Sequence, residues 1–496
     1  MNIKSIQALL ALLAGQTTAE TTLGVYIFHR HGDRTSKSWP PTTLTALGAD
    51  QVYTSASWFR KRYIASNSTN PILNQSPDLA KLSQLSITAP VDNVLQSSAI
   101  VFTQGIYPPA GTAADQTLAN GDSTQAPFDG YQYIPVNIVT SATTSTGSED
   151  SEWLQGSSGC ANAVASSNEY LQSQEYLNLL NQTGAFYQGL LPVYNTTFTS
   201  KTATYQNAYT IFDYVHVSQI HNQTIPSANL LTNDTTLQLQ TLANAHEWGL
   251  AYNESDPVRA IAGAVLAGQI LQTLNTTLNA PLSQTSAERF TIQFGAYGAF
   301  MSFFGLANLT AASDDFRGIV DYASSITFEL VTNATVSGSD APATVDPDDV
   351  SVRFLFVNGT ASDANVPQVY PLFGQSETTI SWNDFAAGIS NFSIDDTMSW
   401  CQACGNTTGV CASASSSGSG SGSAGSGSTS SKSADKITPG VAAGIGILSL
   451  FGVILLIGIA AALAGFRVVR KGSKAATDTG SNGATSPAAR AYNKTA

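Results

Sequence analysis

The chain has 496 residues, a formal net charge of −13 and only 11% charged residues. A chain this acidic, with no basic cluster before its C-terminal tail, argues against nucleic acid as a partner. Its length suits one large domain carrying an insertion, or two contacting domains, between the terminal segments described below.

The first 19 residues have the pattern of a secretory signal. Asn2 and Lys4 precede an apolar stretch at residues 8–14, which is followed by small residues at 17–19. We therefore expect the mature chain to begin near Glu20.

An apolar, β-prone segment at residues 23–28 ends directly in the cationic loop His29-Arg30-His31-Gly32-Asp33-Arg34. In open α/β sheets, ligands bind beyond the carboxyl ends of the strands, and Gly32 lets the backbone approach an anion. Arg30 and Arg34 carry planar donors suited to phosphate oxygens, and His31 is a nitrogen nucleophile able to carry a phosphoryl group. The competing interpretation is a charged surface turn after an edge strand.

A helix is expected next, because Thr45 is a good N-cap and apolar residues follow at helical spacing. Two motifs in this region resemble those of the histidine acid phosphatases, branch 2 of the histidine phosphatase superfamily, which includes the fungal phytases. Residues 30–34 resemble the family's Arg-His-Gly-x-Arg signature, and residues 44–51 resemble its Leu-Thr-x-x-Gly-x-x-Gln. Residues 98–109 are weakly similar to a further family segment, and residues 326–330 and 352–359 to its closing strand pair.

The resemblance implies an α/β fold, with a central, mainly parallel sheet flanked by helices and a smaller, mostly helical cap, similar to phosphoglycerate mutase. The ectodomain at 20–411 would divide into a core at about 20–110 and 285–411 and a cap at about 111–284. The residues themselves agree in part, because Asp256 and Pro257 predict the start of a helix with an apolar face at 261–274.

The resemblance also implies catalytic and ligand roles. His31 would be the phosphate-accepting nucleophile, and Arg30 and Arg34 would bind the phosphate, with no cofactor. No pair among His216, His221 and His246 has the spacing of metal ligands with carboxylates around it, so we expect no metal site.

Two parts of the family's site are missing from this sequence. Val94 occupies the position of a third arginine, and the His-Asp dipeptide that supplies a phosphate ligand and the general acid occurs nowhere. The corresponding stretch is placed at residues 294–300, and Ser36 stands where the family usually has proline. General acid catalysis is worth about 10²–10⁴-fold, so its loss matters most for alkyl phosphates, whose leaving groups need protonation.

Other side chains could substitute for the missing groups. Tyr297 could donate a proton or bind phosphate, and Glu247 beside His246 could act as an acid if the cap brings it near. The competing interpretation makes His246 a packed residue, since leucines recur around it at helical spacing. The alternation at residues 214–218 predicts an extended segment that directs His216 toward the cap cleft or toward solvent.

The four cysteines are an even set, which predicts two structural disulfides in an oxidising compartment. Three pairings are possible, and the Cys-x-x-Cys spacing leaves a redox or zinc site as the alternative. The cysteines are Cys160, Cys401, Cys404 and Cys411.

Thirteen Asn-x-Ser/Thr acceptors between residues 20 and 411 favour N-glycosylation, although Pro77 compromises the one at Asn74. They are Asn67, Asn74, Asn181, Asn195, Asn222, Asn233, Asn253, Asn275, Asn308, Asn333, Asn358, Asn391 and Asn406.

The C-terminal part predicts attachment to a membrane. Residues 412–438 are a flexible stalk rich in Ser and Gly, and residues 439–466 are apolar and long enough to span a bilayer of about 30 Å. The tail at 467–496 begins with a cationic flank, which predicts a single-pass type I protein at the cell surface or in a secretory or vacuolar lumen. The small residues in the span do not predict an oligomeric state.

The sequence thus supports an acid phosphomonoesterase that forms a phosphohistidine on an extracytoplasmic, phosphorylated substrate. The alternative is a membrane-anchored pseudophosphatase that binds a phosphorylated or other ligand without efficient turnover. A third interpretation is an adhesion module on a stalk.

Overall fold

A mixed, eight-stranded sheet lies at the centre of the computed structural model, which describes residues 20–139, 159–338, 341–408 and 411–412. Its strand order is β10-β8-β7-β1-β6-β2-β5, and β9 pairs with β8. β1, β6, β2 and β5 run parallel to one another, and β7 runs antiparallel to β1. The strands are β1 (Thr21–Arg30), β2 (Leu85–Pro90), β5 (Asn137–Val139), β6 (Phe290–Gly295), β7 (Ser325–Thr332), β8 (Val350–Val357), β9 (Gln368–Tyr370) and β10 (Thr379–Ser381).

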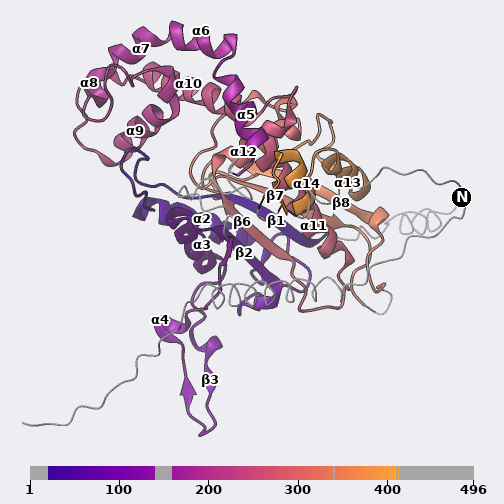
Figure 1. Ribbon diagram of the computed structural model, residues 1–496. Helices are drawn as coiled ribbons and strands as arrows, with labels where there is room; N and C mark the ends of the chain where they lie inside the picture. The colour runs from indigo at the N-terminus through magenta and orange to yellow at the C-terminus, as the bar shows by residue number, and fades with distance from the viewer. Residues whose placement is uncertain (1–19, 140–158, 339–340, 409–410, 413–496) are drawn as a thin grey trace, which may run out of the picture. The chain divides into compact units, whose positions relative to one another are not determined.

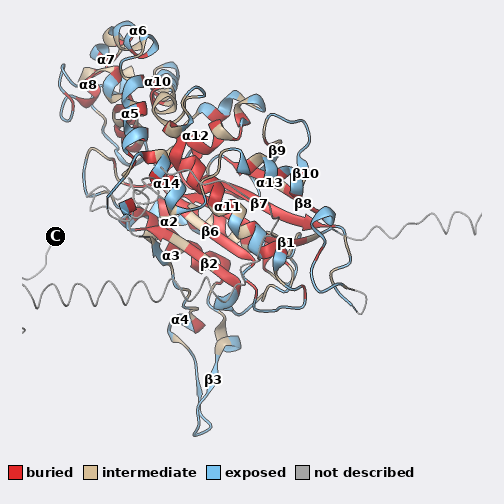
Figure 2. Ribbon diagram, turned by 45° about the vertical axis from the view of Figure 1, so that its right-hand side comes forward, coloured by how far each residue is buried: buried red, intermediate tan, exposed pale blue. Residues whose placement is uncertain are grey.

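β1 is buried on both faces, as expected for a central strand with helices on either side. Val25 and Ile27 pack with α2 (Ala46–Tyr63) and α3 (Asn93–Ile106), whereas Tyr26 and Phe28 pack with α11 (Ile261–Asn279) and α12 (Tyr297–Leu306). Figure 2 shows this layered arrangement, with the strands of the sheet coloured as buried. The α/β fold with helices on both faces is confirmed.

The predicted helix after the loop is α2, and Thr45 caps it by accepting a hydrogen bond from the Gly48 amide. The predicted strand at 23–28 and the closing strand pair are also confirmed, as β1 and as the antiparallel pair of β7 and β8. A 3-10 turn (Pro257–Ala260) precedes α11, which buries one side of the sheet together with α13 (Trp382–Ser390).

A mostly helical group inserted between the sheet strands forms the predicted cap (Figure 1), with a core of its own built largely from tyrosine and leucine side chains. The boundaries of the cap, expected at about 111–284, stay a prediction. β5 and α11 lie within this range, but β5 joins the edge of the sheet and α11 packs on the sheet. The group is preceded in the chain by a hairpin of β3 (Gln116–Thr117) and β4 (Ser123–Thr124) and by the short helix α4 (Pro127–Gly130). The helices of the group are α5 (Ala161–Tyr170), α6 (Gln174–Gln182), α7 (Gly184–Gly189), α8 (Leu191–Tyr194), α9 (Ala208–His221) and α10 (Asn233–Ala251).

The extended segment predicted around His216 is wrong, because residues 208–221 form helix α9. The alternating valines suggest a strand, but packing of α9 against α8 and α10 overrides that local preference. His216 therefore lies on a helix, half-buried, with its ring stacked on Phe212.

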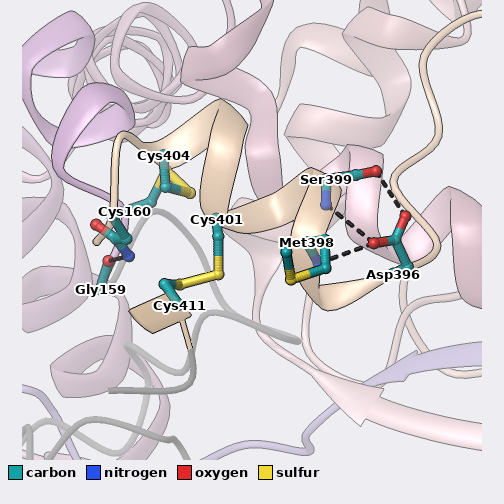
Figure 3. Close-up of a disulfide and its surroundings, with 9 residues drawn as sticks. Gly159, Cys160, Asp396, Met398, Ser399, Cys401, Cys404 and Cys411 are labelled. Atoms are coloured by element: carbon teal, nitrogen blue, oxygen red, sulfur yellow. Dashed lines mark hydrogen bonds between the residues drawn. A yellow bond between two sulfur atoms is a disulfide. The ribbon is translucent and has the colours of Figure 1, made fainter. Parts of the chain in front are cut away.

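Both predicted disulfides are present, and they lie together near α14 (Thr397–Cys404) (Figure 3). Cys160 at the start of α5 is bonded to Cys404, and Cys401 is bonded to Cys411. The two cysteines of the Cys-x-x-Cys spacing thus have different partners and form neither a redox dithiol nor a zinc site. The Cys160–Cys404 bond ties the cap segment to the C-terminal end of the globular part.

Several predicted segments fall outside the described residues: the signal at 1–19, nearly all of the stalk at 412–438, the span at 439–466 and the tail at 467–496. Within the described ranges, no helix combines the length and apolar character needed to cross a bilayer.

We expect removal of the Cys160–Cys404 bond to destabilise the fold more than removal of the Cys401–Cys411 bond. The first closes a sequence separation of 244 residues and the second a separation of 10, and longer loops lose more entropy on closure. Each double Cys→Ser variant should lose free energy of unfolding within the range of about 2–5 kcal/mol, measured by urea denaturation. Equal losses in the two variants would contradict this order.

His29 links stability to pH, because its ring is fully buried between Phe102 and Phe294 and its Nδ1 donates to the Arg30 carbonyl at 2.5 Å. Burial lowers the pKa of His29 from 6.5 to about 4. Between these values the unfolded chain binds a proton that the folded chain does not. The contribution of His29 to the free energy of unfolding is therefore fully present above pH 6.5 and is lost as the pH falls toward 4.

A His29→Phe variant keeps a ring in this packing and removes the titration. Wild type should lose about 2.4 kcal/mol more than the variant between about pH 7 and about pH 4.5, since one pKa unit corresponds to about 1.4 kcal/mol and the titration is incomplete at pH 4.5. Urea denaturation at both pH values measures this difference. The same pH slope in both proteins would show that His29 does not carry the effect.

Candidate active site

The cationic loop follows the C-terminal end of β1, beside the junction between β6 and α12. Arg30, the last residue of β1, is in register with Gly295, the last residue of β6. α12 begins at Tyr297, two residues later. Because β1 and β6 are parallel, their carboxyl ends bring the loop and the start of α12 to the same edge of the sheet.

The second sequence motif holds this loop in place. The Asp33 amide donates to Gln51 Oε1 at 2.8 Å, and Thr45 Oγ1 donates to Asp33 Oδ1 at 2.5 Å. A Cβ atom on Gly48 would lie 2.0 Å from the Asp33 carbonyl oxygen, and one on Gly32 would lie 2.1 Å from the Gly48 oxygen. Only glycine fits at these two positions, so the Leu-Thr-x-x-Gly-x-x-Gln motif acts by fixing the backbone of the loop.

His31 is 1% exposed, and its Nδ1 donates to the Gly32 carbonyl at 2.8 Å. This bond selects the tautomer in which Nε2 carries the lone pair. Burial, followed by the positive charges of Arg30 and Arg34, lowers the pKa of His31 well below 6.5. The imidazole is therefore neutral, and able to act as a nucleophile, in mildly acidic solution.

Arg30 is buried beside His31, between aromatic rings. Its Nη1 donates to the Val320 carbonyl, and its Cζ lies 4.7 Å from the ring centre of Tyr322 and 5.4 Å from that of Tyr297. The ring of Tyr322 also lies 5.6 Å from the His31 ring. Tyr322 thus covers both the predicted nucleophile and one of the two predicted phosphate ligands.

Arg34 has no solvent exposure, and two residues of α9 hold its guanidinium. Nη1 forms an ion pair with Asp213 Oδ1 at 2.9 Å, and Nη2 donates to the Tyr209 hydroxyl at 3.2 Å. The other oxygen of Asp213 accepts from Ser36 Oγ and from the Lys37 amide, each at 2.8 Å. Ser36, which replaces the family's proline, therefore helps to seat a carboxylate beside the loop.

The same helix contacts the loop a second time at its C-terminal end. His221 Nε2 lies 2.6 Å from Asp33 Oδ1. The sequence singled out neither Asp213 nor Tyr209 as a site residue, because their only signal is their position on a helix whose placement depends on the tertiary fold.

On one side of the loop the position of the missing arginine carries no charge. Val94 is completely buried in the first turn of α3. From α3 the loop receives a hydrogen bond at Ser98, whose Oγ accepts from the Gly32 amide at 3.3 Å.

On the other side, the structure brings together the two residues considered as replacements for the missing acid. Tyr297 donates its hydroxyl proton to Glu247 Oε2 at 2.7 Å, and His246 Nδ1 lies 2.8 Å from Glu247 Oε1. The ring of Tyr297 faces Arg30, whereas Glu247 and His246 come from cap helix α10. His246 itself is buried, as the packing interpretation predicted.

A small cavity of about 20 Å³ lies at the site, lined by Arg30, Asp213, His216 and Tyr322 among others. This volume suits about one water molecule. In the parts of the chain that the structure describes, no group of three or more His, Cys, Asp or Glu side chains could hold a metal ion.

Comparisons with known proteins agree with this fold. The phytase from Citrobacter braakii is similar, with a TM-score of 0.50 and 14% identity over 78% of this chain and 100% of the phytase chain. The apo form of Hafnia alvei phytase has a TM-score of 0.50 and 12% identity over 79% of this chain and 99% of that chain. At these identities the likeness shows the fold alone. A comparison with curated proteins found no match.

A family model described as the histidine phosphatase superfamily (branch 2) matches residues 36–357, which is well over half of the chain. The match begins just after the cationic loop, so the loop motif is separate support for the same family. The chain belongs to the histidine phosphatase superfamily, branch 2.

Proposed function

We propose that the chain is an acid phosphomonoesterase in which His31 forms a phosphohistidine intermediate. Family membership supports a phosphoric monoester hydrolase. The single observation that carries the proposal is the state of His31: a neutral ring, with Nδ1 bonded to the Gly32 carbonyl, beside two guanidinium groups at the end of β1.

In the first step His31 Nε2 attacks phosphorus, and the bond from phosphorus to the ester oxygen breaks with its electron pair on that oxygen. Arg30 and Arg34 offset the negative charge on the phosphoryl oxygens. Water then attacks the phosphohistidine, the P–N bond breaks, and the products are inorganic phosphate and neutral His31. The low pKa of His31 supports activity in acid, where a histidine with an ordinary pKa would be protonated.

Tyr297 is the proposed donor of the proton that the leaving oxygen needs. It begins α12 directly after β6, on the side where the sequence lacks the family's His-Asp dipeptide. In the structure this proton is donated to Glu247, so the hydroxyl must rotate toward the leaving oxygen to act as the acid. The contact of Glu247 with His246 then gives a route by which the phenolate regains a proton. A phenol held in this way can act as a general acid, an effect worth about 10²–10⁴-fold.

An extracytoplasmic location is proposed together with this activity, with anchoring through the span at 439–466. Two disulfides support an oxidising compartment. Of the thirteen glycosylation acceptors, all but Asn253 and Asn406 are exposed, which supports N-glycosylation of the folded surface.

The leaving group separates the roles of His31 and Tyr297. We expect His31→Ala to abolish turnover of both p-nitrophenyl phosphate and an alkyl phosphate such as glycerol 2-phosphate at acidic pH. Tyr297→Phe should lower kcat on the alkyl ester by about 10²–10⁴-fold and on the aryl ester by much less, because nitrophenolate leaves without protonation. Steady-state kinetics measure both effects.

Tyr133→Phe is the matched control. It makes the same chemical change at a residue that is 63% exposed and lies outside the site. Activity that survives His31→Ala would overturn the proposed nucleophile. Equal losses on the two esters in Tyr297→Phe would show that this tyrosine is structural.

A pseudophosphatase is the second candidate, and the Arg34–Asp213 ion pair favours it. In this pair Asp213 engages Arg34, one of the two predicted phosphate ligands, and Val94 supplies no third cation. In this case the cleft would bind a phosphorylated ligand weakly and turn it over slowly.

Asp213→Asn tests whether Asp213 competes with phosphate for Arg34. In phosphate-free buffer the variant should lose about 3 kcal/mol of unfolding free energy, because a buried guanidinium loses its counter-charge. Added inorganic phosphate should restore part of this loss and bind more tightly than to wild type, as measured by denaturation and calorimetry.

Asp321→Asn is the control, since Asp321 lines the same small cavity but its carboxylate makes no ion pair with Arg34. If both variants gain phosphate affinity equally, the effect comes from net charge and not from the release of Arg34.

A further inference from the structure

A larger cavity of about 630 Å³ adjoins the small cavity at the site. The two share Gln240 of α10 and the neighbouring residues Ile319 and Val320. Val320 also supplies the carbonyl oxygen that accepts from Arg30. The volume lies within the range of about 300–1,000 Å³ typical of small-molecule sites, and the shared residues place this cavity next to the loop.

One wall of the cavity is aromatic. The Phe316 ring lies 5.0 Å from Tyr370 and 5.2 Å from Phe356, centre to centre, and Trp248 also lines the space. Phe316 and Phe356 are buried, whereas Tyr370 and Trp248 are partly open. Aromatic side chains combine an apolar face with a polar handle, which suits a ligand with both C–H faces and polar edges.

Amide side chains of α10 lie at the same cavity. Gln240 is half-buried and makes no side-chain hydrogen bond to any described part of the chain, although it lines both cavities. Asn244 uses its Oδ1 to accept from the Ile319 amide at 3.0 Å, which leaves Nδ2 as a donor for a ligand. An amide both donates and accepts, as does each hydroxyl of a sugar.

The charges at the cavity disfavour a polyanion. Glu175, Asp314 and Asp315 line it, against one cation, Arg317. Arg317 is already engaged: its Nε lies 3.6 Å from Asp314 Oδ1, and its guanidinium lies 5.2 Å from the Trp248 ring centre. A ligand carrying several phosphates would place them beside these carboxylates and would be repelled.

From the amides, the aromatic wall and this charge we infer that the cavity binds an uncharged sugar ring. The inference rests on the proposed function for the phosphoryl end of the molecule, and it makes the substrate a sugar monophosphate and not a polyphosphorylated alcohol. The sugar hydroxyls bond Gln240 and Asn244, its C–H face packs on the aromatic wall, and its single phosphate reaches the loop.

The first experiment measures sugar binding without turnover. Saturation-transfer NMR with the methyl glycosides of glucose, mannose and galactose should detect binding of at least one of them to wild type. Gln240→Leu should weaken it by about tenfold, the loss of one or two hydrogen bonds. The control is Gln238→Leu, the same substitution at an exposed position of the same helix that does not line the cavity.

The second experiment compares substrates at acidic pH. The kcat/KM for the 6-phosphate of the sugar that binds should exceed that for inositol hexakisphosphate at least about tenfold. The double variant Glu175→Lys/Asp314→Lys, at two exposed positions, should narrow this ratio by raising the value for the hexakisphosphate.

The inference is overturned if none of the glycosides binds, if the two glutamine variants bind equally, or if inositol hexakisphosphate is the better substrate. Sugar binding with no turnover of any phosphate ester would contradict the proposed catalysis but would still support the sugar site. Turnover of p-nitrophenyl phosphate without sugar binding would support the proposed catalysis and contradict the sugar site.

Discussion

The close approach of two backbone segments at Gly32 and Gly48 is the constraint on which the site depends. The first turn of α2 lies against the loop after β1 so tightly that neither position has space for a Cβ atom. Thr45, the N-cap of α2, and Gln51, in its second turn, add hydrogen bonds to Asp33. The contact at Gly32 and Gly48 is made by backbone, so together with these hydrogen bonds it presents His31 and its two arginines in one fixed arrangement.

The consequence of burying this loop is electrostatic. Two guanidinium groups and an imidazole leave water together, and each needs compensation. The imidazole avoids the cost of burying a charge by remaining neutral. Arg30 contacts a carbonyl oxygen and two aromatic rings, and the carboxylate of Asp213 pairs with the charge of Arg34. The cap helix α9 is thereby part of the site, since its Asp213 supplies a negative charge to a buried cation.

The sequence predicted the part of this arrangement that is local in the chain. Strand β1, the loop and the Thr45-capped helix follow one another within residues 21–63, so propensity, capping and motif spacing were enough. The alternation around His216 misled because its helix is stabilised by packing against helices that are distant in the sequence. Asp213 and Tyr209 could not be assigned for the same reason. Tyr297 and Glu247 were recognised as candidates, but they are separated by 50 residues and only the fold brings them into contact.

The position of Asp213 also bears on how a phosphate would enter. Both terminal nitrogens of Arg34 are bonded to α9, and the free space beside Arg30 is about 20 Å³. A phosphate that replaces the Asp213 carboxylate on Arg34 must also break the hydrogen bonds that Asp213 accepts from Ser36 and Lys37. A phosphate that uses Arg30 alone leaves the Asp213 carboxylate in place, but it gains less charge compensation and needs more room than this space offers. The choice between these two modes depends on the cap helix α9 as much as on the loop, because α9 supplies Asp213 and Tyr209 to Arg34.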